Sequence, residues 1–157
     1  MSKVIEIKDR DADGGLAVEL GHLLSLLEKK GPNLMWSVLD LYTMGYTEEN
    51  TDMIELEQRF AQESGGEGFP ISWPALLNLA KSCRQIIDTV IVAYKNPSYR
   101  PILSPTHPVK TLYNQSEIVL ELIDGSVWYV FSLDDEFIER LAHEFRDINV
   151  ITSKEGI

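Results

Sequence analysis

Three aspartates near the N-terminus are the residues whose types and spacing could do chemistry. Asp9, Asp11 and Asp13 occupy alternate positions and Gly14 follows them directly. Calcium-binding loops place oxygen ligands at alternate positions and a glycine where the chain turns sharply. One interpretation is therefore a Ca²⁺ or Mg²⁺ site built on the three carboxylates. The other is a turn rich in aspartate and glycine that precedes a helix.

The calcium interpretation is incomplete at its far end. The twelfth position of such a loop needs a glutamate that binds with both oxygens, but Leu20 stands there and Glu19 comes one residue early. The segment before the loop alternates apolar and polar residues, as a strand does. We therefore expect no cofactor, with a divalent cation at Asp9, Asp11 and Asp13 kept as the alternative.

The signatures of common enzyme classes are missing from the sequence. Cys83 is the only cysteine, so the chain cannot form an internal disulfide. The three histidines, His22, His107 and His143, have no zinc-type spacing to one another or to Cys83. The sequence contains no nucleophile elbow, no zinc-protease motif and no phosphate-binding loop. These absences favour a protein that is not an enzyme.

Aromatic residues are the candidates for binding a partner, because aromatic side chains dominate the energetics of protein interfaces. Trp128 and Tyr129 are adjacent in a predicted strand, so they should face opposite sides of a sheet. One of them should then point away from the core unless both faces are covered. Trp36 is the third candidate, on a strand that places Trp36, Val38 and Tyr42 on one face.

The charge of the chain restricts its partners. The formal net charge is -11, which repels nucleic acid and anionic membranes and favours a basic protein. Acidity of this kind also keeps a protein soluble, and charge alone does not specify a partner. The N-terminus has no signal peptide, and no apolar run reaches the length of a membrane span. We therefore expect a cytoplasmic protein.

The order of predicted elements indicates an α+β fold. The 157 residues suit a single globular domain over 1–157, with a proline-rich irregular loop at 97–110. The predicted sheet is mixed or mainly antiparallel, with about five strands and three to four helices in the order β-α-β-α-α-β-β-β-α. The first strand, helix and strand fit a parallel crossover. The predicted strands are 5–8, 34–43, 86–94, 118–122 and 127–131, with an edge strand possible at 148–151; the predicted helices are 16–27, 53–60, 72–85 and 132–145.

Three local signals support the predicted helices and strands. Asp124 and Gly125 form a strong hairpin signal, and Ser72 and Ser132 are expected to cap helices. In size and charge, though in no motif, the chain is similar to small bacterial immunity and accessory proteins. The sequence thus favours a non-enzymatic acidic interaction protein that binds a basic protein or itself. The alternatives are a protein dependent on a divalent cation and a small-ligand protein with a pocket under 97–110.

Overall fold

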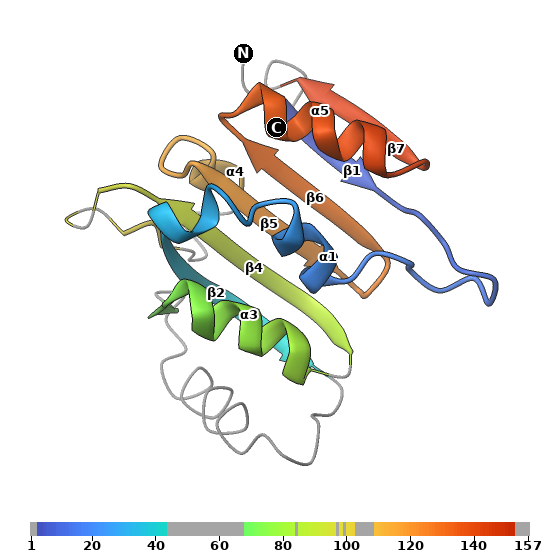
Figure 1. Ribbon diagram of the computed structural model, residues 1–157, viewed down its shortest axis with the longest axis horizontal. Helices are drawn as coiled ribbons and strands as arrows, with labels where there is room; N and C mark the ends of the chain where they lie inside the picture. The colour runs from blue at the N-terminus through green and yellow to red at the C-terminus, as the bar shows by residue number, and fades with distance from the viewer. Residues whose placement is uncertain are drawn as a thin grey trace.

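The fold is described from a computed structural model (Figure 1). The described residues are 3–43, 68–83, 85–96, 98, 100–102 and 109–152. The helix predicted at 53–60 lies outside them. Within the described part of the chain, no helix is both long and apolar enough to cross a membrane.

The described strands form one antiparallel sheet of seven strands, in the order β3-β2-β4-β5-β6-β1-β7. The strands are β1 Lys3–Ile7, β2 Met35–Thr43, β3 Phe69–Ile71, β4 Ile86–Tyr94, β5 Ile118–Ile123, β6 Val127–Ser132 and β7 Ile148–Thr152. The predicted α+β class and mainly antiparallel sheet are confirmed. The predicted strand count is too low because the short β3 gave no signal. β1 and β2 run in the same direction, but β4, β5 and β6 stand between them.

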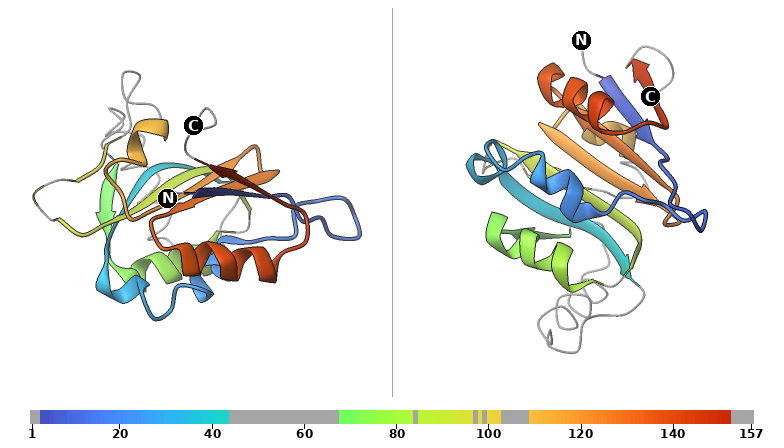
Figure 2. Two further views of the ribbon diagram at one scale, coloured as in Figure 1. Left: turned by 90° about the horizontal axis from the view of Figure 1, so that it is seen from above. Right: turned by 45° about the vertical axis from the view of Figure 1, so that its right-hand side comes forward.

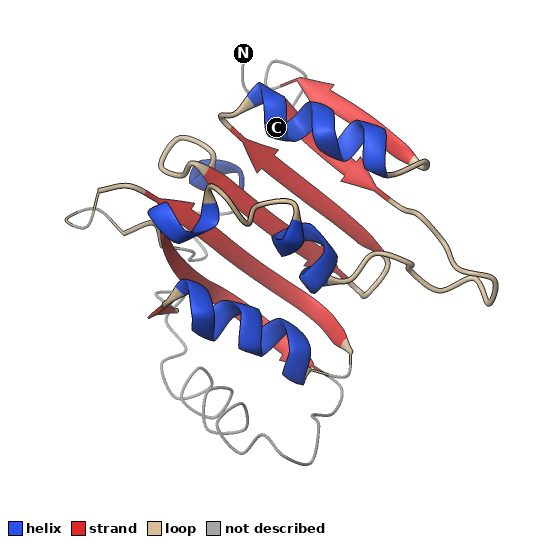
Figure 3. Cartoon of the chain, in the orientation of Figure 1, coloured by secondary structure: helices blue, strands red, loops and turns tan. Residues whose placement is uncertain are grey.

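The helices are divided unequally between the two faces of the sheet (Figure 2). One face, which we call the helix face, carries α1, α3 and α5. The opposite face, the rear face, carries α4 over one end (Figure 3). These helices are α1 Leu20–Ser25, α3 Trp73–Ser82, α4 Val109–Leu112 and α5 Asp135–Glu144, with a 3-10 turn at Gly31–Asn33. α4 begins at Val109, inside the segment predicted to be irregular.

Capping residues explain where the two longest described helices begin. Ser72 accepts a hydrogen bond from the Ala75 N–H at the start of α3, as predicted. The prediction for α5 was wrong, because its cap is Asp134, which accepts from the Glu136 N–H. Ser132 is still part of β6, and its hydroxyl accepts from the Asp134 N–H. The hydroxyl therefore organises the turn between β6 and α5.

The hairpin between β5 and β6 is the turn that the sequence predicted. Asp124 and Gly125 both have positive φ angles, of 51° and 60°. The Ser126 N–H donates to the Ile123 carbonyl across the turn. Two consecutive positive φ angles match the right-handed twist of the flanking strands, which is why this dipeptide favours tight hairpins. The hairpin fixes the register in which Glu121 of β5 lies beside Tyr129 of β6.

Candidate interaction surface

The carboxylates of Asp9 and Asp11 accept hydrogen bonds from backbone N–H groups. The Asp9 carboxylate accepts hydrogen bonds from the Arg146 and Asp147 N–H groups at 2.8–3.1 Å, which ties the loop to the start of β7. Asp11 Oδ1 accepts from the N–H groups of Asp13 and Gly15 at 2.9 and 3.0 Å. Within the described residues, no group of three or more His, Cys, Asp or Glu side chains could hold a metal ion. The geometry therefore matches the turn interpretation and gives the cation interpretation no support.

Two of the three aromatic candidates are core residues. Trp36 and Trp128 are each 1% exposed. The indole N–H of Trp36 donates to the Gly31 carbonyl, and that of Trp128 donates to the Val18 carbonyl, both at 2.9 Å. Their burial and their internal partners leave neither indole available as a binding anchor, which corrects the role predicted for them.

Tyr129 lies on the other side of the sheet from Trp128, as the alternation of a strand requires. It is half-buried on the rear face, and a hydrogen bond with the Glu6 carboxylate raises the pKa of its phenol, as do burial and the nearby charges of Glu6 and Glu121. Tyr129 is thus the candidate that remains for binding.

A β-bulge in β2 decides which side chains share the rear face with Tyr129. Val38 is opposite Ile91 and Asp40 is opposite Val90, so Leu39 is an extra residue. Because of it, Leu39 and Asp40 both face rearward, whereas regular alternation would put Asp40 on the helix face with Val38. The bulge also turns Tyr42 away from the face of Trp36, so the prediction that they share a face was wrong.

Two neighbours hold the bulge in place. Thr89 Oγ1 donates to the Asp40 carbonyl at 2.7 Å. Gly68, with φ +61°, passes so close that a Cβ built on it would lie 2.1 Å from the Val38 carbonyl oxygen. The bulge is therefore specified by contacts from two other segments, and bulges of this kind are frequent where a side chain must be re-aimed.

The bulge completes a line of side chains that crosses the rear face at right angles to the strands. We call it the rear-face row; its members, in register from strand to strand, are Asp40, Val90, Glu121, Tyr129, Glu6 and Asn149. Neighbouring strands are about 4.8 Å apart, so the backbones of acidic residues two strands apart are separated by roughly 10 Å. The row therefore presents three carboxylates at regular spacing.

The next row toward α4 is apolar and buried. Val92, Val119, Phe131 and Val4 lie in register there, and Leu112 of α4 packs on them. The Tyr113 ring stacks on Phe131, with ring centroids 4.6 Å apart. Burial, followed by the nearby charges of Glu121 and Tyr129, raises the pKa of Tyr113 to about 12. The rear-face row thus borders a covered apolar area.

Two carboxylates in the row are held in an unfavourable environment. Burial raises the pKa of Asp40, and the negative charge of Asp88 raises it further, although a backbone hydrogen bond from Leu41 partly offsets this. Burial also raises the pKa of Glu121, with a second contribution from Asp40. Asp88 itself accepts a hydrogen bond from the Asp124 N–H in the hairpin turn. Each shift arises from desolvation and from another negative charge.

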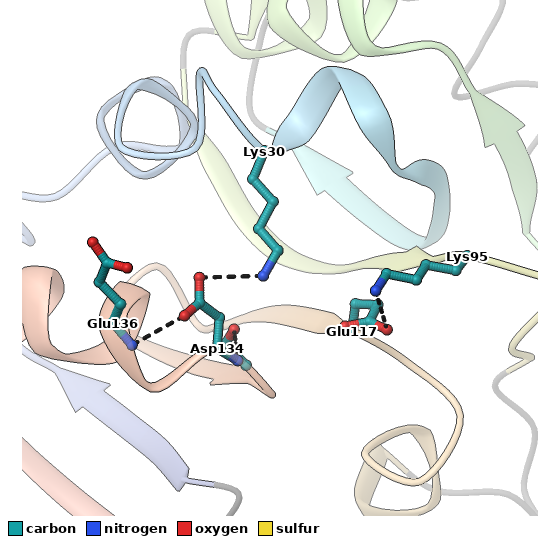
Figure 4. A network of polar contacts seen from close by, with 6 residues as sticks. Lys30, Lys95, Glu117, Asp134 and Glu136 are labelled. Atoms are coloured by element: carbon teal, nitrogen blue, oxygen red, sulfur yellow. Dashed lines mark hydrogen bonds and ion pairs between the residues drawn. The ribbon is translucent and has the colours of Figure 1, made fainter.

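Cations are present elsewhere in the protein. Lys30 Nζ lies 3.2 Å from Asp134 Oδ2, and Lys95 Nζ lies 3.5 Å from Glu117 (Figure 4). Burial alone would raise the pKa of Asp134, but the hydrogen bond and the charge of Lys30 lower it. Glu6 has Lys8 at 3.1 Å. Among the described residues, no lysine or arginine forms an ion pair with Asp40 or Glu121.

Two hollows lie elsewhere on the described surface. One, of about 220 Å³, is on the helix face between α1, α3 and the hairpin, and Glu19, Cys83 and Trp128 contribute to its lining. The other, of about 610 Å³, is a shallow groove that includes Trp73 and Tyr94. The small-ligand interpretation placed its pocket under 97–110; of that segment, the described residues 98 and 100–102 line neither hollow.

Comparison with protein-family models, with curated proteins and with solved structures finds no match for this chain. The function must therefore be inferred from its own residues. Sequence reasoning missed Asp40, Glu121 and Glu6 because their alignment depends on strand order and on the bulge. A carboxylate inside an apolar run, as at Asp40, was the one signal available.

Proposed function

We propose that this protein is a non-enzymatic interaction module that binds a basic protein through the rear-face row. The observation that carries the proposal is the pair Asp40 and Glu121, two half-buried carboxylates in register whose pKa values are raised and which have no cationic partner among the described residues. A carboxylate whose pKa is raised by desolvation and by a specific neighbouring charge is a candidate for a functional site.

The energetic argument follows from the cause of the pKa shifts. The folded protein keeps Asp40 and Glu121 partly desolvated and close to other negative charge, which destabilises their ionised forms. A lysine or arginine from a partner would provide the missing positive charge and charge-assisted hydrogen bonds. Binding a cationic side chain would therefore stabilise the ionised forms of Asp40 and Glu121, which the folded protein alone destabilises.

The shape of the row favours a partner with several basic groups. Asp40, Glu121 and Glu6 lie on β2, β5 and β1, so their backbones are spaced by roughly 10 Å along one line. Tyr129 stands between Glu121 and Glu6 and offers a ring on which a guanidinium can stack. The net charge of -11 would speed the approach of a basic partner. Arginine suits such a site better than lysine because its planar group both stacks and forms paired hydrogen bonds.

Peptide binding to matched variants tests the proposal. The probes are flexible Gly/Ser peptides that carry four arginines, four lysines or four glutamates, measured by fluorescence anisotropy at two salt concentrations. Asp40→Asn combined with Glu121→Gln should weaken arginine-peptide binding about tenfold or more, since two charge-assisted contacts are lost. The control is Glu28→Gln with Glu139→Gln, which removes the same charge from exposed residues. If both double variants lower the affinity for the arginine peptide equally, binding depends only on net charge, and the proposed site is wrong.

A further inference from the structure

The two edges of the sheet are protected very differently. β3 forms one edge; it has only three residues and includes Pro70, which cannot donate a hydrogen bond to a neighbouring strand. β7 forms the other edge with five residues, Ile148–Thr152, and contains neither proline nor a charged residue. Proteins commonly protect exposed edges with proline, charge or short strands. In the described part of the chain, β3 has such protection and β7 has none.

The register shows which backbone groups of β7 are free to pair. The Lys8 N–H donates to the Asp147 carbonyl, and this pair continues the register in which Ile7 is opposite Ile148. Hydrogen-bonded pairs alternate along an antiparallel ladder, so Asn149 and Ile151 also bond toward β1. The N–H and C=O groups of Ile148, Val150 and Thr152 then point outward, where no described strand pairs with them.

The side chains beside this edge differ between the two faces. Val150 is opposite Ile5, on the helix face, and is 43% exposed; α5 packs mainly on β1 and β6. Asn149 is opposite Glu6 and ends the rear-face row. A strand added beside β7 would place alternate side chains next to Val150 and next to the acidic row.

We infer that β7 accepts an antiparallel strand from the basic partner, with apolar residues on the helix face and basic residues on the rear face. The inference rests on the proposed function and specifies the form of the partner segment. The charge of the protein selects this occupant over a second copy, because two chains of net charge -11 repel each other. A rear-face arginine on the added strand would lie two strands, or roughly 10 Å, from Glu6, within reach of the two extended side chains.

Backbone N-methylation of a synthetic peptide tests strand addition directly. The probe is acetyl-Arg-Val-Arg-Val-Arg-Val-Arg-amide, measured against the whole protein by calorimetry. In an antiparallel pair, directly opposed residues share a face and a hydrogen-bonding direction, so the valine N–H groups would face β7. Methylating the valine amides should weaken binding at least about tenfold, and methylating the arginine amides should change it less than about threefold. Equal effects, or a loss only with the arginine amides, would overturn the inference.

A variant of the edge provides the second test. Val150→Pro removes an N–H that points outward, so the fold should survive while one hydrogen bond to the added strand is lost. Val150→Thr keeps the N–H and the branched side chain, and is the control. Val150→Pro should lower the affinity for the alternating peptide about tenfold, and Val150→Thr should lower it less than about threefold. Thermal unfolding of both variants checks that they are folded.

The two proposals fail in distinguishable ways. If binding of the flexible arginine peptide requires Asp40 and Glu121 but binding of the alternating peptide is unchanged by Val150→Pro, the proposal of the rear-face row is supported and strand addition is wrong. If neither peptide is affected by Asp40→Asn with Glu121→Gln, the proposed function itself is wrong. Light scattering that shows a dimer disrupted by Val150→Pro would mean that a second copy, rather than a basic partner, occupies the edge.

Discussion

Replacing Gly68 with alanine tests the geometry on which the rear-face row depends. Gly68 precedes β3 with φ +61°, and a Cβ there would lie 2.1 Å from the Val38 carbonyl oxygen and 2.8 Å from the Leu39 Cα. Both atoms belong to backbone at the bulge, so neither can move away as a flexible side chain would. Gly14, at φ +85° with nothing within 4 Å of a built Cβ, is the matched control.

The expected losses of stability can be separated into a shared part and a specific part. Both substitutions place an L-residue in the left-handed region, which costs about 1–2 kcal/mol. Only Gly68→Ala must also displace the backbone of β2, and forced packing of this kind typically costs about 1–3 kcal/mol more. Any gain from a less flexible unfolded chain is common to both variants and cancels in the comparison.

Urea unfolding followed by tryptophan fluorescence measures the difference. Gly68→Ala should lower the free energy of unfolding by about 2 kcal/mol more than Gly14→Ala does. Gly68→Ala should also weaken binding of the flexible arginine peptide, because displacing the bulge moves Asp40. Equal stability losses in the two variants would refute the close approach of Gly68 to the bulge, and with it the argument that this contact aims Asp40 rearward.

Three further predictions concern the row, the core and the aspartate loop. Asp40→Asn with Glu121→Gln should raise the free energy of unfolding at pH 7, because the ionised carboxylates destabilise the folded protein when its pKa values are raised. This destabilisation is complete above the folded pKa values and absent below the unfolded ones, so the stabilisation by the two substitutions should vanish by about pH 3. An equal stabilisation at both pH values would contradict the prediction. Trp128→Phe should cost about 1–3 kcal/mol in chemical unfolding, because a buried carbonyl loses its donor, and a neutral result would contradict the burial of that bond. Asp9→Ala should lower Tm clearly while Asp13→Ala changes it little, since only the Asp9 carboxylate holds the start of β7; calorimetry with Ca²⁺ should show no heat for the wild type.

The parts of the fold that the sequence predicted are those set by neighbouring residues. The hairpin at Asp124 and Gly125 follows from the backbone preference of that dipeptide, and the start of α3 follows from the Ser72 hydroxyl. The prediction failed for the cap of α5, where Ser132 was chosen and Asp134 was found. Pairing with both β1 and β5 keeps Ser132 extended, and no local pattern reports a strand partner that is distant in the chain.

The candidate surface could not be predicted for the same reason. Glu6, Asp40 and Glu121 are far apart in sequence. They lie in one row only because β1 inserts between β6 and β7 and β4 lies between β2 and β5. The bulge at Leu39 adds one residue to an otherwise regular alternation, so a period of two placed Tyr42 on the wrong face. Tyr129 was identified because the alternation of β6 is regular. Trp36 and Trp128 were misjudged because residue type does not reveal burial.

The most direct test of the rear-face row is an NMR titration of the isotope-labelled protein with the flexible arginine peptide. Binding through the row predicts chemical-shift changes at Glu6, Asp40, Glu121 and Tyr129, which lie on four different strands but share one face. The amides on the outer surfaces of α1 and α5 should change little. Shifts concentrated on the helix face, or spread evenly over all acidic residues, would contradict binding at the row.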